Sequence, residues 1–489
     1  MPCITGTSMS ISQTNTRRSS DLESNGKGEP YDKKDRESIF RYAARLSGHT
    51  LAETREIEID TVDPVRSKGY FGQKLETAYF KLRNNNSPLP DFPEAGLELK
   101  STPMKKSSKG LVSKERLVLN IIDYMAVRER GSWEEAFAKK NSDLLIVFYI
   151  YEKGEAYYDL KVAKVVNWKF TGDDLRIIKD DWSVIESYIL DGRAHELSEG
   201  LTNYLTACTK GSTKEKSMRR QPFSDKDAMQ RALSLKSSYV NKIFRESIDL
   251  HYELESIRVH ETKNVGEPIF KNGWDENMTM DEAILSRTKA FGGMTCRDIE
   301  SVVGEVNPSS KSYYATLCVR IFGVHGKHVR EFEDAGIVMK TVRLTKGGKP
   351  KESMSFPYFK YNEIVNQTWE GSDFYAQLDR KFFIPVFQMT DEDRDKRRAR
   401  FLGAFFWSIP YADMEEARKV WEATRSLIAS GDYEHFPGMK DNRVSHVRPH
   451  GRNNSDTIGG PDGLQHIKRC FWLNARYLNG IIRSNLSRS

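Results

Sequence analysis

Apolar and polar residues alternate along the chain in two distinct periods. In residues 96–100, Gly-Leu-Glu-Leu-Lys, the period is two, which predicts a strand with Glu98 and Lys100 on one face and the leucines on the other. Elsewhere apolar residues recur at spacings of three and four, as on one face of a helix. This pattern predicts helices at 35–48, 68–82, 132–141 and 179–192. Residues 113–124 are expected to form a strand or a buried segment, and the strongly apolar run 143–151 is expected to form a strand. The mixture predicts an α/β fold with a mixed sheet between helices.

Four blocks of sequence recur in the same order at nearly one spacing. Residues 92–102 match residues 332–342, an offset of 240 from 92 to 332, and residues 114–127 match residues 351–364 at an offset of 237. Two further pairs of blocks match at offsets of 239 and 238. The chain is therefore expected to hold two copies of one fold. We expect a disordered arm at 1–34, one domain at 35–255, a linker at 256–278 and a second domain at 279–489.

Composition and charge limit the number of domains, the partners and the cellular compartment that we expect for this chain. A chain of 489 residues is too long for one core, and its 38% hydrophobic and 30% charged residues indicate a well-cored protein. The formal charge of +7 permits a polyanionic partner without requiring one. The five cysteines are scattered, and no apolar run approaches the ~20 residues that span a bilayer. We expect reduced thiols, no membrane association and a cytoplasmic location.

The first copy contains residues suited to cutting a phosphodiester bond. Asp91 precedes a turn containing Pro93, which can fold its carboxylate back beside Glu98 and Lys100. Two carboxylates are hard ligands for Mg²⁺, and a nearby ammonium can stabilise the charge that develops at phosphorus. The same spacing also occurs on solvated strand edges, so by itself it leaves both interpretations open.

The second copy lacks the central acids of this set. Val338 stands where the first copy has Glu98, and Val319 stands where it has Glu76. Glu331 takes the place of Asp91, and Lys340 that of Lys100. Without the central carboxylate no strong Mg²⁺ site should form, so the second copy is expected to be catalytically silent.

Each copy also has a basic loop that can contact DNA. In the first, Lys210 opens a Gly- and Ser-containing segment with four more basic residues up to Arg220. In the second, Arg448 and His450 occupy the equivalent place. Such loops suit phosphate and base-edge contacts, although a charge run is also typical of a plain solvated face.

Three segments taken together resemble a known family. KGYFGQKLE, PDFPEAGLELKSTP and YLTACTKG occur in the order found in the MutH family, which contains a mismatch-repair nicking endonuclease and type II restriction endonucleases that cut at GATC. The resemblance implies two tandem restriction-endonuclease-like domains and a Mg²⁺ cofactor. It assigns metal binding to Asp91 and Glu98. The implied catalytic residues are Glu76, Asp91, Glu98, Lys100 and Lys140, with Lys139 as the neighbouring alternative, and the implied DNA-binding residues are Lys210, Ser234, Lys236, Arg448 and His450.

The resemblance also ranks the possible functions. SKERLVLNIIDY and HELSEGLTNYL, together with the second copy, are similar to the restriction branch, which implies a GATC-specific enzyme on double-stranded DNA. The silent copy would bind a second GATC site, two protomers would assemble to cut both strands, and a cognate methyltransferase would act on the same site. The chain departs from the family pattern at Cys208 and Ser234, which leaves the response to methylation open. The alternatives are a mismatch-repair nickase, a non-catalytic DNA-binding regulator and a generic structure-specific nuclease.

Overall fold

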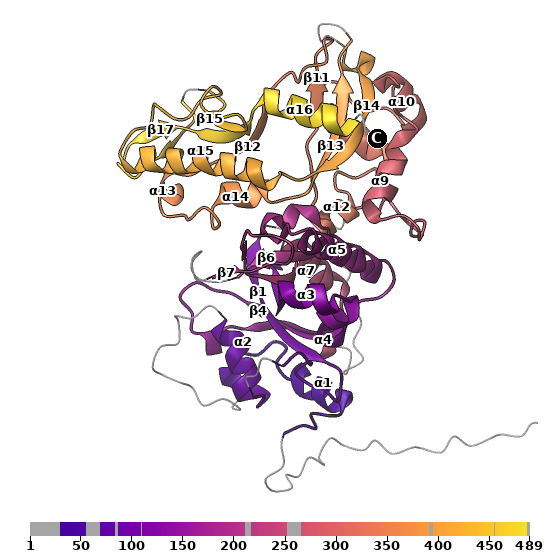
Figure 1. Ribbon diagram of the computed structural model, residues 1–489, viewed down its shortest axis with the longest axis vertical. Coiled ribbons are helices and arrows are strands. Elements are labelled where there is room, and N and C mark those ends of the chain that lie inside the picture. Colours follow the sequence, from indigo (N-terminus) through magenta and orange to yellow (C-terminus); the bar gives the residue numbers. More distant parts are fainter. Residues whose placement is uncertain are drawn as a thin grey trace, which may run out of the picture.

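The chain folds into two lobes stacked along its longest axis (Figure 1). The structure is a computed structural model and describes residues 30–54, 69–83, 87–108, 110–210, 217–251, 266–390, 395–453 and 455–486. The leading half of the chain, coloured indigo to magenta, builds one lobe, and the trailing half, coloured orange to yellow, builds the other. Most of the arm expected at 1–34 lies outside the described residues. Tyr31, within that range, is buried and stacks on Tyr42 with ring centroids 4.6 Å apart.

A four-stranded mixed sheet forms the centre of the leading lobe. Its order is β2-β1-β4-β5, in which β1 and β4 run parallel and the other pairs antiparallel. Leu144 and Ile146 of β4 pack into one apolar cluster, while Leu145 and Val147 pack into another on the opposite face. Burial on both faces explains why this strand is an unbroken apolar run. The strands are β1 (Glu98–Ser107), β2 (Gly110–Ser113), β4 (Asp143–Ile150) and β5 (Val162–Lys169).

Helices cover both faces of this sheet, and a smaller sheet adjoins it. The smaller sheet has the order β3-β9-β6, with all pairs antiparallel. The two short strands β7 and β8 form a ribbon between β6 and β9. The helices are α1 (Arg36–Ala44), α2 (Tyr70–Lys74), η2 (Leu75–Tyr79), α3 (Tyr124–Arg130), η3 (Glu134–Ala138), α4 (Lys139–Asn141), α5 (Gly172–Leu190) and α7 (Ser237–Glu246), and the strands are β3 (Leu117–Ile121), β6 (Leu205–Thr209), β7 (Met218–Arg219), β8 (Ala228–Met229) and β9 (Arg231–Leu235).

The trailing lobe repeats this plan. Strand β13 pairs in parallel with β10 and β11 and antiparallel with β14, and a second sheet has the order β12-β18-β15. Val338 pairs with Phe382 just as Glu98 pairs with Leu144, so the internal repeat predicted from the sequence is also a repeat of strand pairing. The strands are β10 (Val338–Met339), β11 (Val342–Leu344), β12 (Met354–Tyr358), β13 (Phe382–Gln388), β14 (Arg400–Trp407), β15 (Ser445–Pro449), β16 (Thr457–Gly459), β17 (Gln465–Ile467) and β18 (Arg469–Leu473).

The helices of the trailing lobe lie against these sheets. The long α15 crosses the lobe beside β12 and β15, and α16 packs on β14 near the end of the chain (Figure 1). Among the described residues, no helix is long and apolar enough to cross a membrane. The helices are α9 (Met280–Lys289), α10 (Cys296–Val303), α11 (Tyr313–Ile321), α12 (Arg330–Ala335), α13 (Tyr361–Ile364), α14 (Asp373–Leu378), α15 (Tyr411–Ala429) and α16 (Ala475–Leu486).

The two lobes share one continuous apolar core. A single cluster of buried side chains runs from Met104 in the leading half to Ala404 in the trailing half. Polar contacts reinforce this junction. Lys381 of the trailing half donates to the side-chain oxygen of Asn203 at 2.9 Å, and the Arg245 guanidinium lies 2.7 Å from the Asp334 carboxylate. The lobes are therefore joined by packing as well as by the chain between them.

Candidate active site

A tight turn brings the two acidic residues of the leading half together. The backbone of Phe92 pairs with that of Leu97, and Gly96 between them has a φ of +61°, a left-handed conformation that favours glycine. The Asp91 amide donates to Glu98 Oε2 at 3.0 Å, and the Leu99 amide donates to Asp91 Oδ2 at 3.1 Å. The prediction that this turn folds Asp91 back beside Glu98 is confirmed.

Two lysines converge on the same carboxylate. Lys100 Nζ lies 2.5 Å from Glu98 Oε1, and Lys140 Nζ lies 3.6 Å from that oxygen. Lys140 also donates to the Ser87 carbonyl at 3.1 Å, whereas Lys139 points to Glu135, 3.5 Å away. Of Lys139 and Lys140, the two candidates that the sequence offered before β4, Lys140 is therefore the one that reaches the site.

The central carboxylate of the site is withdrawn from water, whereas Asp91 and Glu76 are half-buried. The side chain of Glu98 is only 1% exposed. Burial raises the pKa of Glu98, the charge of Lys100 opposes that rise, and the charge of Asp91 adds to it. The side chains of this strand alternate as expected, with Leu97 and Leu99 facing the core. Glu98, on the opposite face, is buried as well, although a polar face would ordinarily be exposed to solvent.

Glu76 approaches the site from a neighbouring helix. It lies in η2, one turn of π-helix that continues α2, whereas the sequence pattern predicted one regular helix here. Such turns are rare and occur often at functional sites. Burial raises the pKa of Glu76, and the charge of Asp91 raises it further. Glu76 is thus close enough to Asp91 for the charge of that carboxylate to raise its pKa.

Positioning contacts hold this arrangement, and the sequence did not reveal them. Arg36 of α1 reaches the Asp143 carboxylate at 2.7 Å and the Ala95 carbonyl at 3.1 Å, so it ties the acidic turn to the start of β4. Asn141, next to Lys140, donates to the Asn120 side-chain oxygen of β3 at 2.8 Å. Both contacts join residues far apart in sequence, where no local pattern could have indicated them.

The oxygen ligands of the site fit a divalent cation whose coordination is completed by water and by the phosphate of the substrate. Among the residues that the structure describes, no group of three or more His, Cys, Asp or Glu side chains is arranged to hold a metal ion. Asp91 and Glu98 instead offer two oxygen ligands in one cleft. Mg²⁺ is commonly held in this way, by one or two carboxylates together with water and phosphate oxygens.

The candidate DNA-binding residues of the leading lobe lie in two environments. Lys210 is half-buried at the end of β6, where its amide bonds to the Gln230 carbonyl and the basic loop begins. Residues 211–216 of that loop lie outside the described residues. Ser234 and Lys236, by contrast, are buried at the base of the sheet. Lys236 Nζ donates to the Thr202 carbonyl at 2.5 Å, and burial lowers the pKa of Lys236 to about 8. In this structure neither side chain reaches the surface.

In the trailing lobe the equivalent positions take up structural contacts. Glu331 accepts the amides of Ile269 and Phe270, and Lys340 donates to the Ser355 carbonyl at 2.9 Å. Val319 is buried within α11. The candidate DNA-contact residues there are exposed at the end of β15. The Arg448 guanidinium lies 5.2 Å from the centre of the Trp472 ring, and the His450 ring meets Trp472 edge-on.

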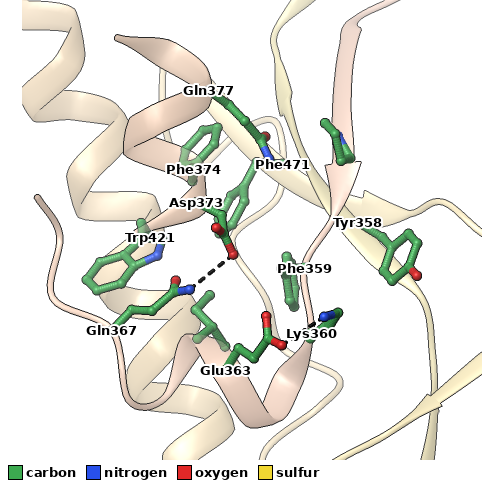
Figure 2. Close-up of a pocket in the computed structure, with 12 residues that line it drawn as sticks. Tyr358, Phe359, Lys360, Glu363, Gln367, Asp373, Phe374, Gln377, Trp421 and Phe471 are labelled. Carbon is green, nitrogen blue, oxygen red and sulfur yellow. Dashed lines mark hydrogen bonds and ion pairs between the residues drawn. The ribbon is translucent and has the colours of Figure 1, made fainter. Parts of the chain in front are cut away.

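The trailing lobe also has a recess of about 280 Å³ (Figure 2). Phe374 and Phe471 stack in its wall, and Gln367 donates to Asp373 at 3.0 Å across it. Tyr358 points away from the recess (Figure 2). The candidate catalytic residues lie in the other lobe, so this recess is separate from their site.

Comparisons with known proteins agree with this geometry. The sequence model of the DNA mismatch repair enzyme MutH matches residues 80–181 and 324–419, one segment in each lobe. The type II restriction enzyme Sau3AI of Staphylococcus aureus is 34% identical over 443 residues, which cover 84% of this chain and 87% of that enzyme.

Mismatch-repair proteins match a smaller part of the chain. The DNA mismatch repair protein MutH of Haemophilus ducreyi is 23% identical over 42% of this chain and 94% of its own length. MutH of Yersinia enterocolitica is 26% identical over 41% of this chain and 90% of its own length. Both relatives correspond in length to one lobe, whereas the restriction enzyme spans both. The chain belongs to the MutH family, in which it is a site-specific deoxyribonuclease of the restriction-enzyme type.

Proposed function

We propose that the protein is a Mg²⁺-dependent type II restriction endonuclease that hydrolyses double-stranded DNA at GATC. The observation that carries the proposal is the convergence of Asp91, Lys100 and Lys140 on the buried carboxylate of Glu98. GATC is the target implied by the family motifs around these residues. The similarity to a restriction enzyme over both lobes supports this function over that of a repair nickase.

Each residue of the cleft has a task in the proposed reaction. A bound Mg²⁺ supplies Lewis-acid polarisation of the phosphate and a water of lowered pKa. Asp91 and Glu98 would hold that ion, and Lys100 would stabilise the negative charge that grows on the phosphate oxygens. Lys140 would add positive charge from the segment before β4, and Glu76 is proposed to assist as a proton acceptor. Water adds to phosphorus as the bond to the 3′ oxygen breaks, which leaves a 5′ phosphate and a 3′ hydroxyl.

Lys100 pairs with Glu98, one of the two carboxylates that would hold the ion. An ion held there would compete with this lysine for Glu98, and an ammonium freed from Glu98 would be available to the phosphate. The ion pair with Lys100 offsets part of the cost of burying the Glu98 carboxylate, which is 1% exposed. It predicts competition between the ammonium of Lys100 and the metal ion.

The trailing lobe is proposed to be a silent copy that binds a second GATC site through Arg448 and His450. The shared apolar core gives it a rigid connection to the catalytic lobe. We further propose that two protomers assemble on DNA, that a cognate methyltransferase protects the same site, and that the enzyme acts in the cytoplasm. Cys208, Cys296, Cys318 and Cys470 are buried free thiols, in keeping with a reducing compartment.

A plasmid digest tests this function. The protein should cut a plasmid with mapped GATC sites in Mg²⁺, should leave it intact in EDTA, and should leave a plasmid without GATC uncut. Parallel digests of adenine-methylated and unmethylated plasmid would reveal the response to methylation. Cutting at another sequence, or cutting in EDTA, would refute the proposal.

A further inference from the structure

A β-bulge turns one large apolar side chain of the leading lobe out to solvent. In β3 the pairing with β9 shifts register between Val118 and Ile121. Ile121, at the end of the strand, is 58% exposed, although Leu117 and Leu119 before it are buried. Bulges occur beside active sites, where they redirect a side chain. The bulge thus places an apolar side chain at the surface, and its neighbours indicate what it can contact.

The surroundings of Ile121 place it between the two candidate functional regions. The preceding residue, Asn120, accepts the hydrogen bond of Asn141, and Asn141 follows Lys140 of the cleft. On the other side, Ile121 pairs with Ala232 of β9, and Ala232 pairs with Cys208 of β6, two residues before Lys210. Two strand spacings separate Ile121 from Cys208, roughly 10 Å. Ile121 therefore lies next to Asn120, which is bonded to the residue after Lys140, and two strands away from the end of β6 that leads to Lys210.

The trailing lobe repeats the same device. Strand β12 has its register shift against β18 between Ser355 and Tyr358, the position that corresponds to Ile121 in the repeat. Tyr358 is 41% exposed, points away from the nearby recess (Figure 2), and has the Lys468 ammonium 5.0 Å from its ring centre. Both copies thus expose one large side chain at this point beside basic residues, although the two side chains differ.

We propose that Ile121 contacts the C5-methyl group of thymine in the target sequence and contributes to its recognition. The inference rests on the proposed GATC function. A lysine that reads a base does so through guanine O6 and N7 in the major groove, and the thymine methyl group is exposed in that same groove. An apolar side chain beside such a lysine complements this methyl group, which no polar residue can recognise as well.

Uracil substitution tests the contact, because uracil lacks only the methyl group. Cleavage rates are measured on a GATC duplex, on the same duplex with uracil replacing the thymine of one strand or both, and on one with uracil outside the site. The wild-type enzyme should lose about three- to fivefold in kcat/KM with uracil inside the site, the scale of one buried methyl group. Uracil outside the site should have no effect.

Three variants complete the test. Ile121→Ser should cut the thymine duplex more slowly than wild type and should not distinguish it from the uracil duplex, whereas Ile121→Val should retain most of the discrimination. Ile248→Ser is the matched control, because Ile248 is 48% exposed beside the end of α7, away from the cleft, and should keep the wild-type ratio. Equal cutting of both duplexes by the wild type, or full discrimination by Ile121→Ser, would overturn the contact. Failure of the wild type to cut the thymine duplex would instead overturn the GATC function, and the contact with it.

Discussion

Strands β1 and β10 occupy the same place in their lobes but differ in what they carry. Each begins with a residue that pairs in parallel with the neighbouring central strand, Glu98 with Leu144 and Val338 with Phe382. Val338 packs against the apolar core of its lobe, whereas Glu98 is a buried carboxylate held by two lysines and a backbone amide. Since the fold forms with valine at this position, the carboxylate is not required for folding and is best explained by chemistry.

The same comparison separates the other residues of the site. Lys340, the counterpart of Lys100, is half-buried, donates to a backbone carbonyl and lies 5.2 Å from the centre of the Phe356 ring. Burial lowers the pKa of Lys340. Glu331, the counterpart of Asp91, binds two backbone amides. When the central acid is absent, the remaining charged side chains serve structure.

The largest effect is expected from the central acid. Glu98→Ala should lower the cleavage rate by about 10³-fold or more, because it removes a ligand of the ion that stabilises the transition state. Binding to a GATC duplex should remain. Val338→Ala, the matched change in the trailing lobe, should leave the rate within about twofold, since large-to-small changes at half-buried sites act mainly on stability. Rates and gel-shift affinities measure both, and cutting by Glu98→Ala would show that the assigned site is wrong.

The paired lysines should separate activity from stability. Lys100→Ala should slow cleavage by about 10²-fold, yet it should bind Mn²⁺ more tightly because Glu98 loses its competing ammonium. Lys340→Ala should instead destabilise the fold by ~1–3 kcal/mol, because it leaves the Ser355 carbonyl without its partner. Turnover and thermal unfolding of the two variants provide the check. A slower turnover in Lys340→Ala with unchanged stability would contradict the structural role of this lysine.

A smaller effect is expected from the residues proposed to contact DNA. Lys210→Ala should weaken binding to GATC by ~1–3 kcal/mol and leave binding to other sequences nearly unchanged, if this lysine reads a base edge. Arg448→Ala should leave cleavage of a one-site duplex unchanged and reduce the stimulation by a second site. An equal loss of affinity for every DNA sequence would show that Lys210 contacts a phosphate and does not read a base.

The smallest effect should come from pH. Burial raises the pKa values of Glu98 and Glu76 above their ordinary value of 4.5, so both take up protons at a higher pH than exposed carboxylates. Their protonation stabilises the fold, and this contribution is fully present below pH 4.5 and is lost as pH rises through the raised values. Metal binding has the opposite dependence, because the ligand must be deprotonated. The Mn²⁺ affinity of the wild type should therefore fall on acidification while pH is still above 4.5, and an affinity that stays constant over this range would contradict the assignment of Glu98 as a ligand.

Much of the fold followed from local patterns. The periods of two and about 3.6 located β1, β4, α1 and α5, and the repeat predicted a second lobe with the same strand pairing. The sequence was less informative about the linker expected at 256–278. Residues 252–265 lie outside the described residues, and Ile269 is buried against the trailing lobe. A sequence repeat cannot show that two copies share a core, because that depends on which faces meet.

The site was predictable where its residues are neighbours in the chain. Asp91, Glu98 and Lys100 lie within one turn and strand, and Lys140 was selected because the family places a lysine before the central strand. The burial of Ser234 and Lys236 was not predictable, since it arises from the packing of β9 against the interlobe junction. The turn of π-helix at Glu76 and the bulge before Ile121 also left no pattern in composition or period.

Calorimetric titration of the full-length protein with Mn²⁺ tests the central claim most directly. The account predicts one binding site per chain in the wild type and in Val338→Ala, and none of comparable affinity in Glu98→Ala. If Glu98→Ala bound Mn²⁺ as tightly as the wild type, or if a change in the trailing lobe abolished the site, the assignment of the catalytic ion to the leading lobe would be wrong.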